Sequence, residues 1–262
     1  MEKPKIGLQL YTVREDCAKD FSGTVRKVAE LGYEGVELAG DGGLSARELK
    51  SLFTDCGLKV AGSHSPIEEI RNRLERVIEF NREVGNRRIV CPYLPTSFQE
   101  RGRAGYLEAA CMLYGAAQRL REVGMTLSYH NHSFEFVRDG EAYLLDTLLE
   151  QTAGAGVLAE IDTYWIQHGG ESPVGYIRKY SGRIELLHIK DMASGPDRAF
   201  AEIGSGILDW NSIFTAAEEA GVAWYIVEQD VCPGPPLESA KRSLDYLEAR
   251  GMLHPRGNES PG

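Results

Sequence analysis

The chain alternates short apolar runs with longer segments of helical periodicity. The apolar runs are rich in β-branched and aromatic residues, as is typical of buried strands. They occupy residues 6–11, 34–38, 58–63, 88–93, 125–131, 156–162, 184–190 and 223–229. Their starting points are spaced by roughly 31 residues, which is the size of one strand, one helix and two loops.

The segments between the runs contain residues that are typical of helix ends. "FSGTVRKVAELG" (21–32) and "NSIFTAAEEAG" (211–221) both end in glycine, which suits a left-handed helix cap. Eight strand–helix units predict an α/β fold, a single (β/α)8 TIM barrel that takes in residues 1–262. The sequence "HPRGNESPG" (254–262) is polar and contains proline and glycine, so we expect residues 252–262 to form a flexible tail.

Composition and charge narrow the range of partners. Hydrophobic residues make up 42% of the chain and charged residues 26%, as in an ordinary globular protein. The net charge of −10 argues against nucleic acid, because no basic patch is apparent in the sequence to bind its phosphates. The five cysteines are scattered without a C-x-x-C pair, and no apolar run is long enough to span a membrane. We expect a cytoplasmic protein that binds a small molecule and not a membrane.

Metal-binding residue types follow the last four predicted strands. In a TIM barrel these strand ends meet at one mouth, where active sites are built. One residue from each end gives the set Glu135, Asp162, His188 and Glu228. Three carboxylates and one imidazole suit Mn²⁺, our first choice, or Mg²⁺, Co²⁺ or Zn²⁺. Singly, each has a structural alternative: Asp162 could cap a helix, His188 could be a hydrogen-bonded core residue, and Glu228 could pair with a lysine.

The order of several motifs resembles the xylose isomerase-like TIM-barrel superfamily of sugar phosphate isomerases and epimerases. These motifs are "YHNHSFEF" (129–136), "EIDTYWIQHGG" (160–170), "LLHIKD" (186–191), "GSGILDW" (204–210) and "YIVEQD" (225–230). "IGLQLYTVR" and "LGYEGVEL" resemble the first two strands, so the resemblance covers residues 6–249. It implies a divalent metal at the mouth, held by Glu135, Asp162, His188 and Glu228.

One departure from the family concerns Glu135. In several branches the first glutamate lies on the fifth strand itself, about where this chain has Ser128. His130 or His132 could therefore replace Glu135 as a ligand. The resemblance further implies proton removal next to a sugar carbonyl, with a metal-stabilised enediolate and with Glu135 and Glu228 taking and returning the proton.

Other polar residues are candidates for substrate contact. Lys190 has the same strand parity as His188, so it should also project into the mouth and could stabilise an oxyanion as a catalytic group. Glu160 should point one layer deeper than Asp162. "IGSGILDW" (203–210) resembles a phosphate loop, although a structural turn is favoured. The substrate-binding candidates are His64, His130, His132, Trp165, His168 and Lys190, while Gln9 and Glu37 could contact substrate or fill a polar layer.

The expected function is a metal-dependent isomerase or epimerase of a ketosugar or keto-glycoside. The alternative is a lyase similar to inosose dehydratases or 3-keto-glycoside deglycosylases, in which the same deprotonation expels a β-substituent. That branch includes enzymes with a small partner subunit, and a homo-oligomer is also left open. Type IV apurinic endonucleases share the barrel, but the acidic charge and the six histidines argue against that class. The complete ligand set argues against a binding module without chemistry.

Overall fold

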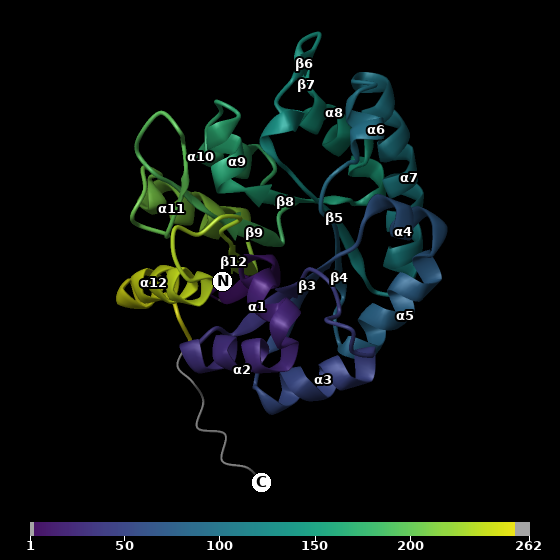
Figure 1. The fold of residues 1–262 in the computed structure, drawn as a ribbon. Helices are drawn as coiled ribbons and strands as arrows, with labels where there is room; N and C mark the ends of the chain where they lie inside the picture. The colour runs from purple at the N-terminus through teal and green to yellow at the C-terminus, as the bar shows by residue number, and fades with distance from the viewer. Residues whose placement is uncertain (1–2, 255–262) are drawn as a thin grey trace.

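The computed structural model of the chain describes residues 3–254, and eight parallel strands in it close into a barrel (Figure 1). The last barrel strand pairs with the first, which closes the sheet. The predicted (β/α)8 barrel is therefore confirmed. The barrel strands are β1 (Lys5–Gln9), β2 (Gly35–Leu38), β3 (Lys59–His64), β4 (Arg88–Cys91), β5 (Thr126–His130), β8 (Leu158–Asp162), β9 (Leu186–Ile189) and β12 (Trp224–Val227).

Helices surround the barrel and connect its strands (Figure 1). The predicted glycine caps are present, since Gly32 after α2 and Gly221 after α11 have φ of 115° and 77°. The helices are α1 (Arg14–Lys19), α2 (Phe21–Leu31), α3 (Ala46–Asp55), α4 (Ile67–Asn72), α5 (Leu74–Val84), α6 (Thr96–Gln99), α7 (Arg103–Glu122), α8 (Leu144–Gln151), α9 (Thr163–His168), α10 (Pro173–Lys179), α11 (Trp210–Ala220) and α12 (Pro236–Ala249), with 3₁₀ turns η1 (Leu10–Val13), η2 (Ser133–Glu135) and η3 (Ala153–Ala155).

Two small hairpins decorate the loops that follow barrel strands. β6 (Arg138–Asp139) pairs with β7 (Ala142–Tyr143) after β5, and β10 (Asp191–Met192) pairs with β11 (Phe200–Ala201) after β9. Strands of two residues are too short to produce a hydrophobic pattern, and the sequence did not predict them. Most of the predicted tail, residues 255–262, lies outside the described residues. At its start, His254 Nδ1 lies 2.7 Å from Glu34 Oε1.

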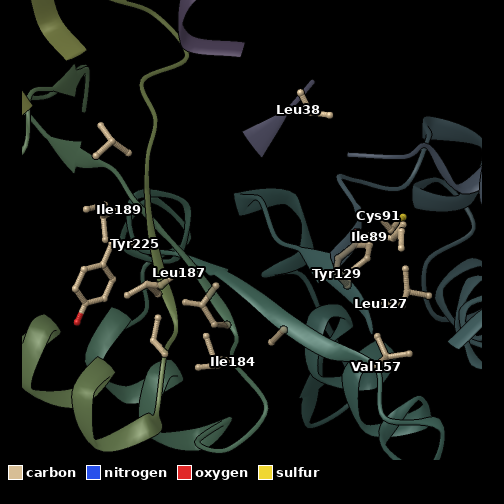
Figure 2. Packing of buried hydrophobic residues seen from close by; sticks show 14 of the residues in the cluster. Leu38, Ile89, Cys91, Leu127, Tyr129, Val157, Ile184, Leu187, Ile189 and Tyr225 are labelled. Carbon is tan, nitrogen blue, oxygen red and sulfur yellow. The ribbon is translucent and has the colours of Figure 1, made fainter. Parts of the chain in front are cut away.

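The strands carry two separate apolar layers. The larger core packs the barrel against its helices, and Figure 2 shows side chains of this core from several strands, including Ile89, Leu127, Leu187 and Tyr225. The alternating residues fill the barrel interior with a small cluster of Ala61, Val90, Leu186, Trp224 and Ile226. Gly35 makes room for this plug, because a Cβ there would lie 2.7 Å from Trp224 Cη2. The apolar plug separates a polar mouth from the opposite end of the barrel.

Candidate metal centre and active site

The carboxyl ends of four neighbouring strands, β5, β8, β9 and β12, bring a buried polar cluster together at the mouth of the barrel. We call His130, Asp162, His188, Lys190 and Glu228 the upper cluster. His188 Nδ1 lies 2.8 Å from Glu228 Oε2, and Lys190 Nζ lies 2.7 Å from that same oxygen. Lys190 Nζ also lies 3.1 Å from Asp162 Oδ2, which is 3.7 Å from His130 Nε2. The inward parity predicted for His188 and Lys190 brings both to one site.

A second layer lies beneath the upper cluster and consists of two buried glutamates, Glu37 and Glu160, which we call the lower carboxylates. Glu37 Oε2 lies 2.7 Å from His188 Nε2, and Glu160 Oε2 lies 3.0 Å from His130 Nδ1. His64 Nε2 lies 3.1 Å from Glu37 Oε2 and 3.4 Å from Glu160 Oε2. Each imidazole of the upper cluster therefore has one nitrogen against a lower carboxylate and its other nitrogen turned toward the mouth.

The electrostatic surroundings of the two cluster histidines differ. Burial alone would lower the pKa of His188, but Glu160 and Glu37 outweigh burial and hold that pKa well above its usual value. For His130, burial and the positive charge of His188 both act downward, so its pKa lies well below the usual value. His130 is consequently a neutral imidazole, and one of its ring nitrogens has a lone pair that can bind a metal ion.

The carboxylates at the mouth have pKa values shifted in opposite directions. Burial would raise the pKa of Glu228, yet Lys190 and His188 outweigh it and lower that pKa. Burial raises the pKa of Asp162 to about 6 although Lys190 opposes this effect. Asp230, whose Oδ1 accepts a hydrogen bond from Lys190 Nζ at 2.8 Å, has a pKa raised by burial. At neutral pH the mouth thus holds an ionised Glu228 beside a more readily protonated Asp230.

The upper cluster fits a divalent cation. Within residues 3–254, His130, Asp162, His188 and Glu228 each offer a ligand atom, and these atoms lie within 4.8 Å of one another. Asp162 Oδ2 is buried and accepts no hydrogen bond, but it lies 3.1 Å from Lys190 Nζ, which is also 2.7 Å from Glu228 Oε2. A positive charge therefore already lies between these two carboxylates. Two imidazoles and two carboxylates are ligands that Mn²⁺, Co²⁺ and Zn²⁺ accept. A deeper group, His64, His130, Glu160 and His188, also has ligand atoms within 4.8 Å of one another. It offers one carboxylate, whereas the upper cluster offers two.

The structure does not bring Glu135 into either ligand group. β5 ends at His130, and the chain then turns into η2, which directs Glu135 into the protein. Its carboxylate accepts hydrogen bonds from Tyr129 Oη at 2.6 Å and from the His132 backbone N–H at 2.8 Å. Burial raises the pKa of Glu135 to about 8. Of the two alternatives to Glu135 as a ligand, His130 is the one that the structure places in the upper cluster.

The remaining substrate-binding candidates lie at different depths. His64 belongs to the lower layer, where it contacts both lower carboxylates. The His132 and Trp165 rings lie 5.3 Å apart, and Lys190 Nζ is 5.8 Å from the centre of the Trp165 ring, so this aromatic pair borders the upper cluster. The His168 ring packs 5.5 Å from Trp165 on the side of α9. His64, His132 and Trp165 thus adjoin the clusters, whereas His168 lies behind Trp165.

Three residues near the site gain roles that the sequence pattern did not assign. Glu37 supports His188 from across the barrel, and Gln9 Nε2 donates to Glu37 Oε2 at 2.8 Å. Asp230 follows Glu228 at the same strand parity, which could have signalled its place beside Lys190.

The glycine-rich loop after β9 is a structural turn. The Asp191 carboxylate accepts hydrogen bonds from the backbone N–H groups of Gly204 at 2.9 Å and Gly206 at 3.1 Å. Asp191 also accepts from Leu208 N at 3.2 Å and from Trp210 Nε1 at 2.7 Å. Because a buried carboxylate already takes these donors, they are not available to a phosphate.

The fold and the site define the class of the protein: the chain belongs to the xylose isomerase-like TIM-barrel family, whose model matches residues 25–250. An inosose dehydratase of Lacticaseibacillus casei is 31% identical over 150 residues, which are 50% of this chain and 50% of the relative. The chain therefore spans about half the length of that relative. An inosose dehydratase of Geobacillus thermodenitrificans is 24% identical over 265 residues, covering 87% of this chain and 88% of the relative.

Solved structures agree with the family assignment. The structure of a sugar phosphate isomerase/epimerase from Parabacteroides distasonis has a TM-score of 0.82 and 25% identity, and the match covers 97% of this chain and 100% of that one. Within residues 3–254, no helix is both long enough and apolar enough to cross a lipid bilayer.

Proposed function

We propose that the protein is a divalent-metal-dependent enzyme that removes the proton next to the carbonyl of a ketosugar or keto-cyclitol. The observation that carries this proposal is the two-layer arrangement of the mouth. His130 and His188 each direct one nitrogen toward Asp162 and Glu228, while their other nitrogens are fixed by the lower carboxylates. A carboxylate behind a ligating histidine is the usual way in which proteins orient such a ligand.

The upper cluster supplies the ligands in this proposal. His130, Asp162, His188 and Glu228 would hold the cation, for which Mn²⁺ is our first choice and Mg²⁺, Co²⁺ or Zn²⁺ are alternatives. When bound, the cation acts as a Lewis acid that stabilises negative charge on the substrate oxygens. Lys190 remains protonated, because the carboxylates around it outweigh burial and hold its pKa well above the usual value. Its ammonium donates a hydrogen bond to the developing oxyanion.

The two carboxylates after β12 provide the acid and the base. Glu228 is ionised, as a base must be, whereas the raised pKa of Asp230 suits an acid that protonates a leaving or developing hydroxyl. Both carboxylates follow β12 and contact the same Lys190 ammonium, at 2.7 and 2.8 Å, so they reach the mouth from the side of β12. Proton removal and proton delivery therefore occur on one face of the substrate.

The positions of the acid and the base favour some of the reactions that begin with this deprotonation over others. Epimerisation needs proton return to the opposite face, and Glu135, the carboxylate expected there, is instead bound to Tyr129 and His132. Isomerisation and β-elimination are both compatible with acid and base on one face. The relatives named inosose dehydratases favour elimination of water. We therefore place a lyase reaction on an inosose-like keto-cyclitol first and ketosugar isomerisation second.

Product analysis tests this proposal. The Mn²⁺-loaded protein would be incubated separately with an inosose and with a set of ketopentoses and ketohexoses, and the products identified by mass spectrometry and ¹³C NMR. Loss of water from the inosose supports the lyase, and an isomer of unchanged mass from a ketosugar supports the isomerase. Failure of the loaded protein to convert any of these compounds, or equal conversion by an Asp162→Asn variant, would contradict the proposal.

A further inference from the structure

A second hollow lies at the end of the barrel opposite the mouth. Two cavities of about 670 Å³ and 600 Å³ adjoin there and share Lys5, Arg87, Arg88 and Trp224. Lys5, Arg88 and Trp224 stand at the amino ends of β1, β4 and β12. The apolar plug of the barrel interior separates this hollow, which we call the basic basin, from the upper cluster.

The basic basin concentrates positive charge in an acidic protein. Besides the shared Lys5, Arg87 and Arg88, the first cavity is lined by Lys3 and the second by Lys50, Lys59 and Arg82. Among the described residues that line the two cavities, Glu218 is the single acid. The whole chain has a net charge of −10, yet seven lysines and arginines line these two cavities. A positive field in a hollow raises the local concentration of anions.

The cations of the basin are partly held in place. Arg88 Nε lies 2.7 Å and Arg87 Nη2 lies 2.9 Å from Glu185 Oε1, so one carboxylate holds both guanidinium groups. Burial lowers the pKa of Arg88, Glu185 offsets part of this effect, and the neighbouring charge of Arg87 adds to the lowering. Lys5 Nζ lies 5.9 Å from the centre of the Trp224 ring. Arg87 and Arg88 therefore share one acceptor oxygen, and an additional anion would offset the repulsion between their two guanidinium groups.

Helix termini explain only part of this charge. The carboxyl ends of the helices reach this end of a TIM barrel, and cations there offset the helix dipoles. Arg82, in the last turn of α5, fits that structural role. Lys5, Lys59 and Arg88 are carried by the amino ends of strands and not by the last turn of a helix, within which the dipole effect falls off. Their convergence on a cavity of ligand size needs another reason.

We propose that the basic basin binds a small anion that carries two or more phosphate groups. The lysine and guanidinium donors suit phosphate oxygens, and the number of cations matches a ligand with several negative charges. The two cavities, at about 670 Å³ and 600 Å³, have volumes typical of sites for small molecules. This site is independent of the proposed reaction, because it lies at the other end of the barrel.

Isothermal titration calorimetry with inorganic tripolyphosphate at physiological ionic strength tests the proposal. We expect one tripolyphosphate per chain. The variant Lys59→Gln/Arg87→Gln changes two exposed residues of the basin and should raise the dissociation constant by about tenfold or more. The matched control Lys27→Gln/Arg101→Gln removes the same charge elsewhere, from an exposed lysine and from an arginine paired with Glu108 at 2.6 Å. The control should bind as tightly as the wild type.

Three results would overturn the proposal, provided that circular dichroism shows each variant to be folded. The first is the absence of tripolyphosphate binding by the wild-type protein. The second is an equal loss of affinity in both double variants, which would indicate attraction by net charge alone. The third is cosedimentation with phosphatidylserine-containing vesicles that is lost in Lys59→Gln/Arg87→Gln and that tripolyphosphate does not compete away, which would identify a membrane surface as the anion.

Discussion

Replacing Glu160 by glutamine tests whether the lower carboxylates orient the metal ligands. Glu160 Oε2 lies 3.0 Å from His130 Nδ1 and 3.3 Å from His188 Nε2. The side chain is fully buried, so water cannot take over these contacts without rearrangement. Glutamine keeps the shape of the side chain but removes its charge, and its amide can present an N–H to a ring nitrogen that expects an acceptor.

The size of the effect follows from the strength of the bonds. A hydrogen bond to a charged group contributes about 1.5–3 kcal/mol, against about 1 kcal/mol for a neutral pair, so losing the charge costs about 0.5–2 kcal/mol. Because about 1.4 kcal/mol corresponds to a tenfold change in affinity, the loss is roughly tenfold for one imidazole. Two imidazoles are affected. We expect the dissociation constant for Zn²⁺ or Mn²⁺ to rise by about 10–100-fold, as is usual when such supporting groups are lost.

The assay is calorimetric titration of the metal-free protein with Zn²⁺ and then with Mn²⁺. Glu202→Gln serves as the matched control. Glu202 lies in the loop after β11, is also buried, and accepts a hydrogen bond from Ser239 Oγ at 2.9 Å. Circular dichroism would verify that both variants fold. An unchanged metal affinity in folded Glu160→Gln, or the same loss in Glu202→Gln, would show that Glu160 does not orient the metal ligands.

Three further predictions concern single side chains. Glu228→Gln, which removes the proposed base, should lower turnover of the identified substrate by about 10² or more and stop exchange of the proton next to the carbonyl; wild-type exchange in this variant would assign the base elsewhere. Lys190→Met should also lower turnover by about 10² but leave that exchange measurable, and complete loss of exchange would count against its role. Burial raises the pKa of Glu135 from 4.5 to about 8, so the folded state retains a proton that the unfolded state releases. Its contribution to stability is present at low pH and is lost as the pH rises through about 8, and the free energy of urea unfolding of the wild type should fall relative to Glu135→Gln between these values. Parallel pH profiles would show that Glu135 titrates normally.

The barrel could be predicted from sequence because of how its strands are buried. Strands of a parallel barrel are covered on both faces, so each reads as a short apolar run bounded by loop residues. Strand parity then places His188 and Lys190 on the same face, and the structure brings both to the mouth. Parity also indicated that Glu160 points one layer deeper than Asp162, and it lies there against His130.

The parts that the sequence could not supply depend on geometry beyond a strand. Glu135 follows β5 by several residues, and the η2 turn, which no periodicity signals, directs it away from the mouth. Glu37 reaches His188 at 2.7 Å from a strand on the other side of the barrel, and that distance depends on closure and stagger. Sequence parity fixes the face of a residue but not its partner across the interior.

Deuterium exchange is the most direct test of the central claim, that the mouth binds a divalent cation and removes a proton next to a carbonyl. An inosose and a set of ketosugars would be incubated in D₂O with the Mn²⁺-loaded protein, with the chelator-treated protein and without protein, and followed by ¹H NMR. With the loaded protein we expect at least one compound to lose the signal of the proton next to its carbonyl, at a rate well above that in the other two samples. Equal exchange after chelation, or no exchange above the protein-free rate with any of these compounds, would contradict it.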